Sequence, residues 1–437
     1  MSIRCVHLDL KGLPPTESRL LSLPSVFAAA GYNAILVEWE DAFPWTVDLR
    51  LRSETAYSPQ IVAGFHARAR ELGMEIIPLV QCLGHMETPL SLPDYAHLRE
   101  VPDRSDCLNP LAPRARELVE RMIDDVLSAS VDRDSRPPKY FHIGGDEAWS
   151  FGSHPDTRAF IKKHGKPALF LHHVEPLLRK LASQGIRPLI WHDMMHDWNE
   201  VELARVAPLA DVVAWGYQGH PDDAKGHFKT SVIERMHRAG MTIWCATAYK
   251  GADSAGDADL PDLAARIANA RGWMAVHDRL ELRGGLIATA WSRYSAHRVQ
   301  CEPIDGALDA MVQVGAILNS GEPLSERTLQ NVLRSCGELE RFESCRRALA
   351  SLSGARKRAL YRASLLSEQI AVEQMDARRR GSGVLQTLEN LADRALAVVE
   401  SAARDVQKAL SGLIEPIWIE RYLAERLIPL RGLIPHK

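Results

Sequence analysis

Eight short apolar segments recur over roughly the first 300 residues, and most are separated by a stretch with helical spacing. Strands that alternate with helices form parallel sheets, because each helix returns the chain to the same end of the sheet. Eight such units favour a closed (β/α)8 TIM barrel over an open doubly wound sheet. No GxGxxG motif follows the first segment, which further disfavours a dinucleotide-binding sheet. The expected strands are residues 5–10, 34–38, 75–80, 139–143, 188–191, 212–215, 242–245 and 286–290.

Helical patterns fill the intervals between these strands, and several end at a glycine such as Gly31, Gly73 or Gly185. Glycine is favoured there because it adopts the left-handed conformation that ends a helix. The expected helices are residues 18–30, 59–72, 113–128, 167–184, 229–239 and 260–278.

The pattern becomes wholly helical after residue 300. Two helices are expected in this region, one over 360–375 and one after the hinge Arg380-Gly-Ser-Gly383. Because the hinge is short, we expect the two helices to pack as an antiparallel pair. We therefore expect a catalytic barrel over 1–300 and a C-terminal helical region over 301–437, packed on the barrel as an appendage; a homodimer formed through it is the alternative. Apolar residues spaced by threes and fours form a seam typical of a coiled coil: Leu385, Leu388, Ala392, Ala395, Val399, Ala403, Val406 and Leu410.

Charge and cysteine content restrict the partners and the compartment. The 53 basic and 56 acidic residues nearly balance, so neither nucleic acid nor an anionic membrane is expected as a partner. No apolar run reaches the roughly 20 residues that span a bilayer, and a strand-like pattern begins at once, so we expect no signal peptide. Seven cysteines without a CxxC pair indicate reduced, mostly buried thiols in a cytoplasmic protein.

The fourth expected strand leads into two glycines and two adjacent acids, Asp146 and Glu147. Active sites of (β/α)8 barrels lie at the carboxyl ends of the strands. Neighbouring side chains on an extended chain point in opposite directions, and glycine allows a ligand to approach closely. The two acids are therefore expected to face different parts of one substrate, although acids after a strand also cap helices.

Indoles and carboxylates gather at the other expected strand ends. Trp191, Trp215, Trp244 and Trp291 lie at or next to four of them. Indole rings stack on the apolar faces of sugars or enclose small apolar groups. Because a carboxylic acid can protonate a glycosidic oxygen, the combination predicts a carbohydrate site.

Several motifs resemble one enzyme family. His142-Ile-Gly-Gly-Asp-Glu147 resembles the catalytic motif of the family 20 glycoside hydrolases, the β-N-acetylhexosaminidases. The chain is most similar to the hexosaminidase D branch of that family, over roughly residues 3–300. The motifs that carry this similarity are His7-Leu-Asp-Leu-Lys-Gly12, Glu38-Trp-Glu-Asp-Ala-Phe-Pro44, Ile77-Pro-Leu-Val-Gln81, Gly84-His-Met-Glu87, His97-Leu-Arg-Glu-Val101 and Trp291-Ser-Arg-Tyr294.

The resemblance implies substrate-assisted, retaining hydrolysis without a metal or a cofactor. Glu147 would be the general acid and base, and Asp146 would orient the 2-acetamido group that attacks carbon 1 to form an oxazolinium ion. Tyr249 would donate a hydrogen bond to the acetamido oxygen. His85, with Asp41 or Glu40, would orient Glu147. Three indoles would enclose the acetamido methyl group: Trp191, Trp215 and Trp291.

Two departures concern the outer hydroxyls of the sugar. Asp9 and Lys11 lie near a position where many members have an arginine, and Arg293 stands where many have a glutamate. The choice between galacto and gluco configuration therefore stays open, with galactosaminides favoured by the resemblance. Terminal N-acetylhexosamine glycans are the expected substrates. The expected substrate-binding set is Asp9, Glu40, His85, Trp191, Asp193, Trp215, Trp291 and Arg293.

Three other classes of protein fit parts of the pattern. A metal-dependent barrel hydrolase would use residues such as His7, His85, His192 and Asp193, but no HxH or HExxH spacing supports it. A sugar-binding module that has lost catalysis would be expected to have a damaged acid pair, and both acids are present. A coiled-coil interaction protein, in which the helical region is the functional part and the barrel is structural, is a further alternative.

Overall fold

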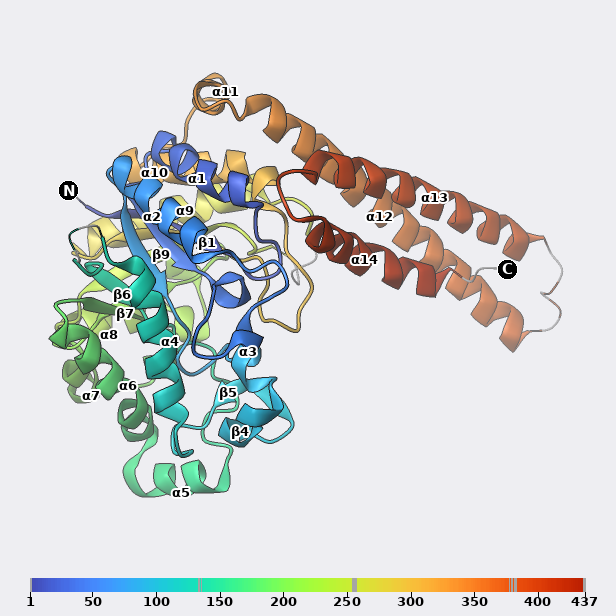
Figure 1. Cartoon of the computed structure of the whole chain (residues 1–437). Helices are drawn as coiled ribbons and strands as arrows, with labels where there is room; N and C mark the ends of the chain where they lie inside the picture. Colours follow the sequence, from blue (N-terminus) through green and yellow to red (C-terminus); the bar gives the residue numbers. More distant parts are fainter. Residues whose placement is uncertain are drawn as a thin grey trace.

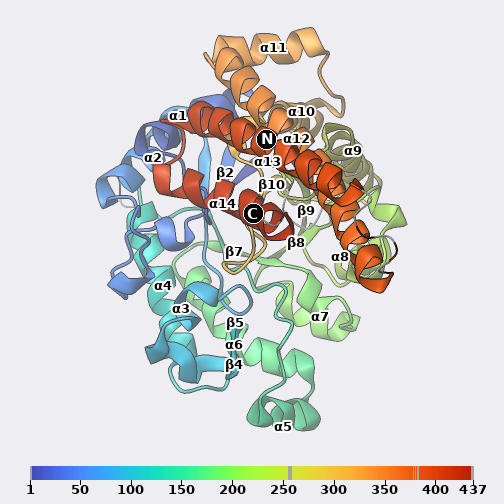
Figure 2. The ribbon, with the colours of Figure 1, turned by 90° about the vertical axis from the view of Figure 1, so that its right-hand side faces the viewer.

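The computed structural model describes residues 2–132, 134, 136–253, 258–376, 378, 380 and 383–434, without the side chain of His227. Eight parallel strands close into a barrel in the order β1-β10-β9-β8-β7-β6-β3-β2 (Figures 1 and 2). This confirms the predicted TIM barrel. The strands are β1 (Arg4–Asp9), β2 (Ala34–Glu38), β3 (Glu75–Leu79), β6 (Tyr140–His142), β7 (Arg187–Trp191), β8 (Asp211–Trp215), β9 (Ile243–Lys250) and β10 (Leu286–Ala290).

Helices surround the strands, as the alternating pattern predicted. In α4 (Ala115–Ser130), Leu118, Met122 and Val126 recur every four residues and are all buried, so one apolar stripe faces the barrel. The other helices on the outside are α1 (Glu17–Ala29), α2 (Pro59–Glu71), α5 (Pro155–His164), α6 (Lys166–Ser183), α7 (Glu200–Val206), α8 (Thr230–Arg238), α9 (Leu263–Arg279) and α10 (Leu308–Ser320).

Two elements between β3 and α4 were not predicted. The short α3 (Glu87–Leu90) follows the β3 loop, and an antiparallel hairpin of β4 (Arg99–Val101) and β5 (Arg104–Leu108) packs against it. The sequence of β5, Arg-Ser-Asp-Cys-Leu, is too polar to resemble a barrel strand. These elements matter because they border the cavity described below.

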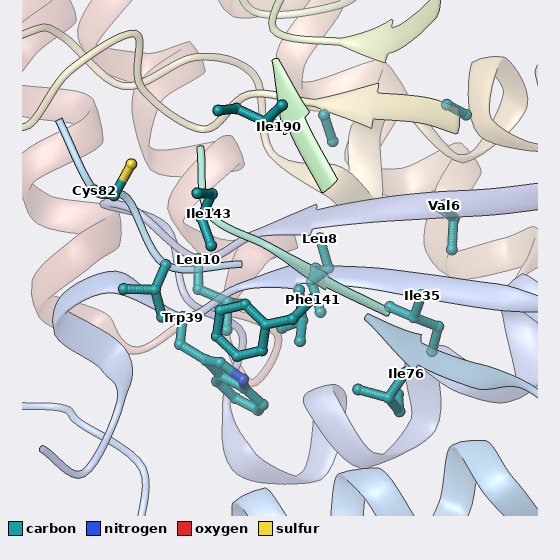
Figure 3. Close-up of a cluster of buried hydrophobic side chains, with 14 of the residues drawn as sticks. Val6, Leu8, Leu10, Ile35, Trp39, Ile76, Cys82, Phe141, Ile143 and Ile190 are labelled. Atoms are coloured by element: carbon teal, nitrogen blue, oxygen red, sulfur yellow. The ribbon is translucent and has the colours of Figure 1, made fainter. Parts of the chain in front are cut away.

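Apolar side chains form one layer inside the barrel and another between strands and helices. All five residues of β2 are buried, as expected for a parallel strand covered on both faces. Figure 3 shows part of the outer layer, where the ring of Phe141 lies next to Trp39 and Ile35 lies near Ile76. The strands are thereby held in place, and the polar chemistry is confined to their carboxyl ends.

The C-terminal helical region contains α11 (Glu326–Ser335), α12 (Leu339–Met375), α13 (Val384–Leu410) and α14 (Pro416–Leu433). The long helices α12 and α13 run side by side and project from the barrel (Figure 1). The predicted seam is buried or partly buried between them. Helix α12 begins well before the predicted residue 360, and residues 381 and 382 of the predicted hinge lie outside the described residues.

Helix α14 connects the helical region to the barrel, consistent with an appendage that packs on it. The guanidinium of Arg426 is buried and lies 2.9 Å from Asp259 in the β9–α9 loop. The division at residue 300 stays a prediction, and so does a homodimer. Helix α10, which lies beyond residue 300 and before α11, packs on the barrel strands β1, β9 and β10.

The seven cysteines are all free, and only Cys336 is partly exposed. This confirms the expectation of reduced, mostly buried thiols. Within the described part of the chain, no helix is both long and apolar enough to cross a bilayer.

Candidate active site

A cavity of about 850 Å³ opens at the carboxyl ends of the barrel strands. Its volume is typical of a small-molecule site. Asp146 and Glu147, which follow β6, both line it, so the structure brings the predicted acid pair into this cavity.

The turn that carries the acids depends on close backbone approach. Gly144 has φ of 63°, and a Cβ added there would collide with the side chain of Gln81; one added at Gly84 would collide with the carbonyl oxygen of Asp146. Glu147 itself has φ of 44°, an unfavourable value for a residue with a side chain. Such strain often marks a functional position.

Asp193 stabilises this turn through a hydrogen bond to its backbone. Its Oδ2 accepts a hydrogen bond of 2.9 Å from the backbone N–H of Glu147, and its Oδ1 accepts one of 3.2 Å from the indole N–H of Trp215. Burial, together with the negative charge of Asp146, raises the pKa of Asp193 to about 7. Asp193 was predicted to bind substrate, but it lies outside the cavity lining and connects the acid turn to an indole.

His85 lies between the two acids. Its Nε2 is 3.3 Å from Oε2 of Glu147 and 3.5 Å from Oδ2 of Asp146. Burial alone would lower the pKa of His85, but the charge of Asp146 and hydrogen bonds to both acids outweigh it and raise that pKa well above its usual value. A charged imidazole therefore lies against both carboxylates. The side chain of Asp146 is buried, whereas that of Glu147 is 29% exposed.

One side of the cavity, the indole wall, consists of Trp191, Trp215, Tyr217 and Trp291. Trp191 and Trp291 lie 6.1 Å apart between ring centroids, and Tyr217 stacks on Trp215 at 5.2 Å. The hydroxyl of Tyr217 is buried, next to the side chains of Thr289 and Trp291. The wall therefore combines an apolar enclosure with one buried hydroxyl.

Another part of the lining, the charged wall, consists of Lys11 and Glu87. It meets the indole wall where Nζ of Lys11 lies 5.6 Å from the ring centroid of Trp291. Nζ of Lys11 lies 2.7 Å from Oε1 of Glu38 and 3.3 Å from Oδ1 of Asp9. These two carboxylates neutralise a lysine that is almost completely buried. The lysine in turn stabilises their charge.

Tyr249 does not lie where the sequence predicted. Strand β9 extends to Lys250 instead of ending near Cys245, so Tyr249 belongs to the strand. Its ring packs in the layer between strands and helices, and its hydroxyl donates a 3.2 Å hydrogen bond to the carbonyl oxygen of His7. Tyr249 is therefore not part of the cavity lining, and the corresponding hydroxyl there is that of Tyr217.

Three other predicted substrate-binding residues also lie outside the lining. Asp9 accepts backbone hydrogen bonds from Lys11 and Ser292. Glu40 accepts a 3.0 Å hydrogen bond from the hydroxyl of Thr88. The guanidinium of Arg293 lies 5.6 Å from the ring centroid of Trp418 in α14. Each makes contacts within the protein instead.

The cavity lining also includes residues that were not predicted to belong to the site. Tyr217 is two positions after Trp215 on an extended chain, so their shared direction was predictable. Trp149 is 67% exposed at the cavity rim, two residues beyond Glu147. Arg104 and Asp106 come from the unpredicted hairpin. Among the described residues, no group of three or more histidines, cysteines or acids is arranged to hold a metal ion.

Comparisons with known proteins agree with this geometry. Residues 38–230 match the catalytic domain of glycosyl hydrolase family 20. Hexosaminidase D from Bos taurus is 34% identical over 69% of this chain and 87% of its own length. Hexosaminidase D from Homo sapiens is 30% identical over 98% of this chain and 92% of its own length.

Solved structures share the fold at low sequence identity. The chitobiase from Flavobacterium johnsoniae has a TM-score of 0.56 at 15% identity, covering 99% of this chain and 78% of its own. A β-N-acetylhexosaminidase from Streptomyces coelicolor has a TM-score of 0.52 at 17% identity, covering 78% of this chain and 69% of its own.

A (β/α)8 barrel that presents paired carboxylates and an indole wall in one cavity has the features of a glycoside hydrolase. The chain belongs to glycosyl hydrolase family 20 and is a hexosaminidase of that family.

Proposed function

We propose that the chain removes terminal β-linked N-acetylgalactosamine or N-acetylglucosamine by substrate-assisted, retaining hydrolysis through an oxazolinium intermediate. The observation that carries this proposal is the acid pair, in which two adjacent carboxylates share His85 but differ in exposure. The names of the hexosaminidase D relatives support the substrate class.

Glu147 is the proposed general acid and base. Its partly exposed carboxyl group can reach a glycosidic oxygen at the cavity mouth, and later a water molecule. The backbone hydrogen bond to Asp193 and the contact with His85 fix its position. Placement of this kind is what a proton donor needs in the transition state.

Asp146 is proposed to hold the N–H of the 2-acetamido group. Its carboxylate is buried beside His85, away from the mouth. A carboxylate there would stabilise the positive charge that develops when the acetamido oxygen attacks carbon 1. The attacking atom would thus come from the substrate, and Asp146 would not form a bond to the sugar.

We assign to Tyr217 the role that the resemblance implies for Tyr249. Its buried hydroxyl lies in the indole wall, beside Thr289 and Trp291, where it could donate to the acetamido oxygen. Trp191, Trp215 and Trp291 would enclose the acetamido methyl group. The indole wall would therefore select for the N-acetyl substituent.

Release of p-nitrophenol from the aryl β-N-acetylgalactosaminide and β-N-acetylglucosaminide tests the proposal. We expect turnover of at least one, with inhibition by the thiazoline analogue of the oxazoline intermediate. Tyr217→Phe should slow this turnover, whereas Tyr249→Phe should not change how the 2-acetamido group is recognised. Absence of turnover of both glycosides by pure, folded protein would overturn the proposal.

A further inference from the structure

Glu87 is a buried carboxylate that faces the cavity without a side-chain partner; the donor beside it is its own backbone N–H. It is the first residue of α3 and lines the cavity, yet it is only 4% exposed. In the described part of the chain, no side chain donates a hydrogen bond or forms an ion pair with its carboxylate. Because an unpaired buried carboxylate is costly, this arrangement calls for a ligand that donates hydrogen bonds.

Neighbouring acids do not share this property. Asp9 and Glu38 are paired with Lys11, and Asp193 accepts two hydrogen bonds. Burial raises the pKa of Glu87, and the positive charges of His85 and Lys11 partly oppose that effect. The two positive charges therefore make the ionised form of Glu87 less unfavourable than burial alone would.

The barrel order places Lys11 and Glu87 across the cavity from Trp191 and Trp215, whereas Trp291 lies beside Lys11, 5.6 Å from its Nζ. Lys11 follows β1 and Glu87 follows β3, on either side of β2, whereas the indoles follow β7, β8 and β10. An acetamido group held by the indole wall leaves the hydroxyls of carbons 4 and 6 on the other side of the sugar. Those hydroxyls would then lie toward the charged wall.

Lys11 can contribute a donor at the same place. Its ammonium group has three N–H bonds, and two carboxylates lie within 3.3 Å of it. One N–H can therefore point into the cavity that Lys11 lines. A donor next to an acceptor is suited to a pair of sugar hydroxyls.

We propose that Glu87 is a specificity-determining residue that accepts a hydrogen bond from the carbon-4 or carbon-6 hydroxyl of the terminal N-acetylhexosamine, with Lys11 as the adjacent donor. This deepens the proposed function and depends on it. Many members of the family have a glutamate at the position of Arg293, and in this chain Glu87 would supply the acid for the outer hydroxyls instead.

The test compares wild type, Glu87→Gln and Glu87→Ala on the parent aryl glycosides and on their 4-deoxy and 6-deoxy analogues. Loss of a hydrogen bond to a charged group should lower kcat/KM on the parent roughly 10- to 100-fold. On the analogue that lacks the bound hydroxyl, wild type and Glu87→Ala should be nearly equal. Glu75→Gln is the matched control, because Glu75 lies at the other end of β3 and pairs with Lys139.

A structural role would give a different result, since the loss would then be the same on all three substrates. Such a uniform loss, or no loss on the parent glycoside, would overturn the assignment. Glu87→Gln keeps the shape of the side chain and can be tested if Glu87→Ala does not fold. Failure of the wild type to hydrolyse the parent would instead refute the proposed function, so the two failures are distinguishable.

Discussion

The two walls of the cavity are built in different ways. The indole wall consists of large rings at the ends of β7, β8 and β10, which contact one another directly. The charged wall depends on carboxylates behind it, because Glu38 and Asp9 neutralise Lys11 while Glu87 remains unpaired. An apolar wall thus follows from residue type and strand position, whereas a charged wall depends on which groups are paired.

Glu147→Gln should have the largest effect, since Glu147 lies between the two walls and supplies the proton. We expect a loss of about 10²- to 10⁴-fold in kcat on a methyl glycoside, whose leaving group needs protonation. The loss should be much smaller on a dinitrophenyl glycoside, and the preference between galacto and gluco substrates should not change. Equal losses on both leaving groups would contradict the proton-donor role.

Lys11→Met should destabilise the charged wall. It leaves Asp9 and Glu38 buried without their cation, which typically costs about 3–5 kcal/mol. Urea denaturation at pH 7 would measure this loss, with Lys11→Arg as the control that keeps the charge. If Lys11→Met were as stable as Lys11→Arg, the ion pairs would not support the wall.

Trp291→Leu should alter mainly the indole wall, although Nζ of Lys11 lies 5.6 Å from the ring centroid of Trp291. The smaller side chain leaves space beside the 2-substituent, so kcat/KM on the N-acetyl substrate should fall while an N-butanoyl substrate is tolerated better. The expected change in relative preference is roughly 10-fold, as for one or two methylene groups in an apolar pocket. An altered preference at carbon 4 instead would show that the two walls are not separate.

Glu40→Gln should have the smallest effect near pH 5, and its effect should grow as pH rises. Burial, together with the charge of Glu38 and despite that of Lys11, raises the pKa of Glu40 from 4.5 to about 8. Between these values the unfolded chain loses the proton and the folded chain keeps it, so the wild type loses stability as pH rises. Glu40→Gln has no proton to lose at this position. Its free energy of unfolding, measured by urea denaturation from pH 5 to pH 8, should therefore decline less steeply than that of the wild type. Parallel declines would contradict the raised pKa.

The sequence predicted the eight strands and the acid pair because both depend on local patterns. It misplaced Tyr249 because β9 continues beyond the expected end and turns that ring outward. Asp9, Glu40 and Arg293 were assigned to the substrate because strand-end position does not reveal which groups pair within the protein. The β4–β5 hairpin was missed because its polar strands lack an apolar pattern.

Substrate assistance is the central claim, and substrates with one, two or three fluorines on the acetamido methyl group test it most directly. Fluorine withdraws electron density from the acetamido oxygen and makes it a weaker nucleophile. If that oxygen attacks carbon 1, kcat of the wild type should fall with each added fluorine. A kcat that does not depend on fluorination would contradict the account, because the nucleophile would then come from the protein or from water.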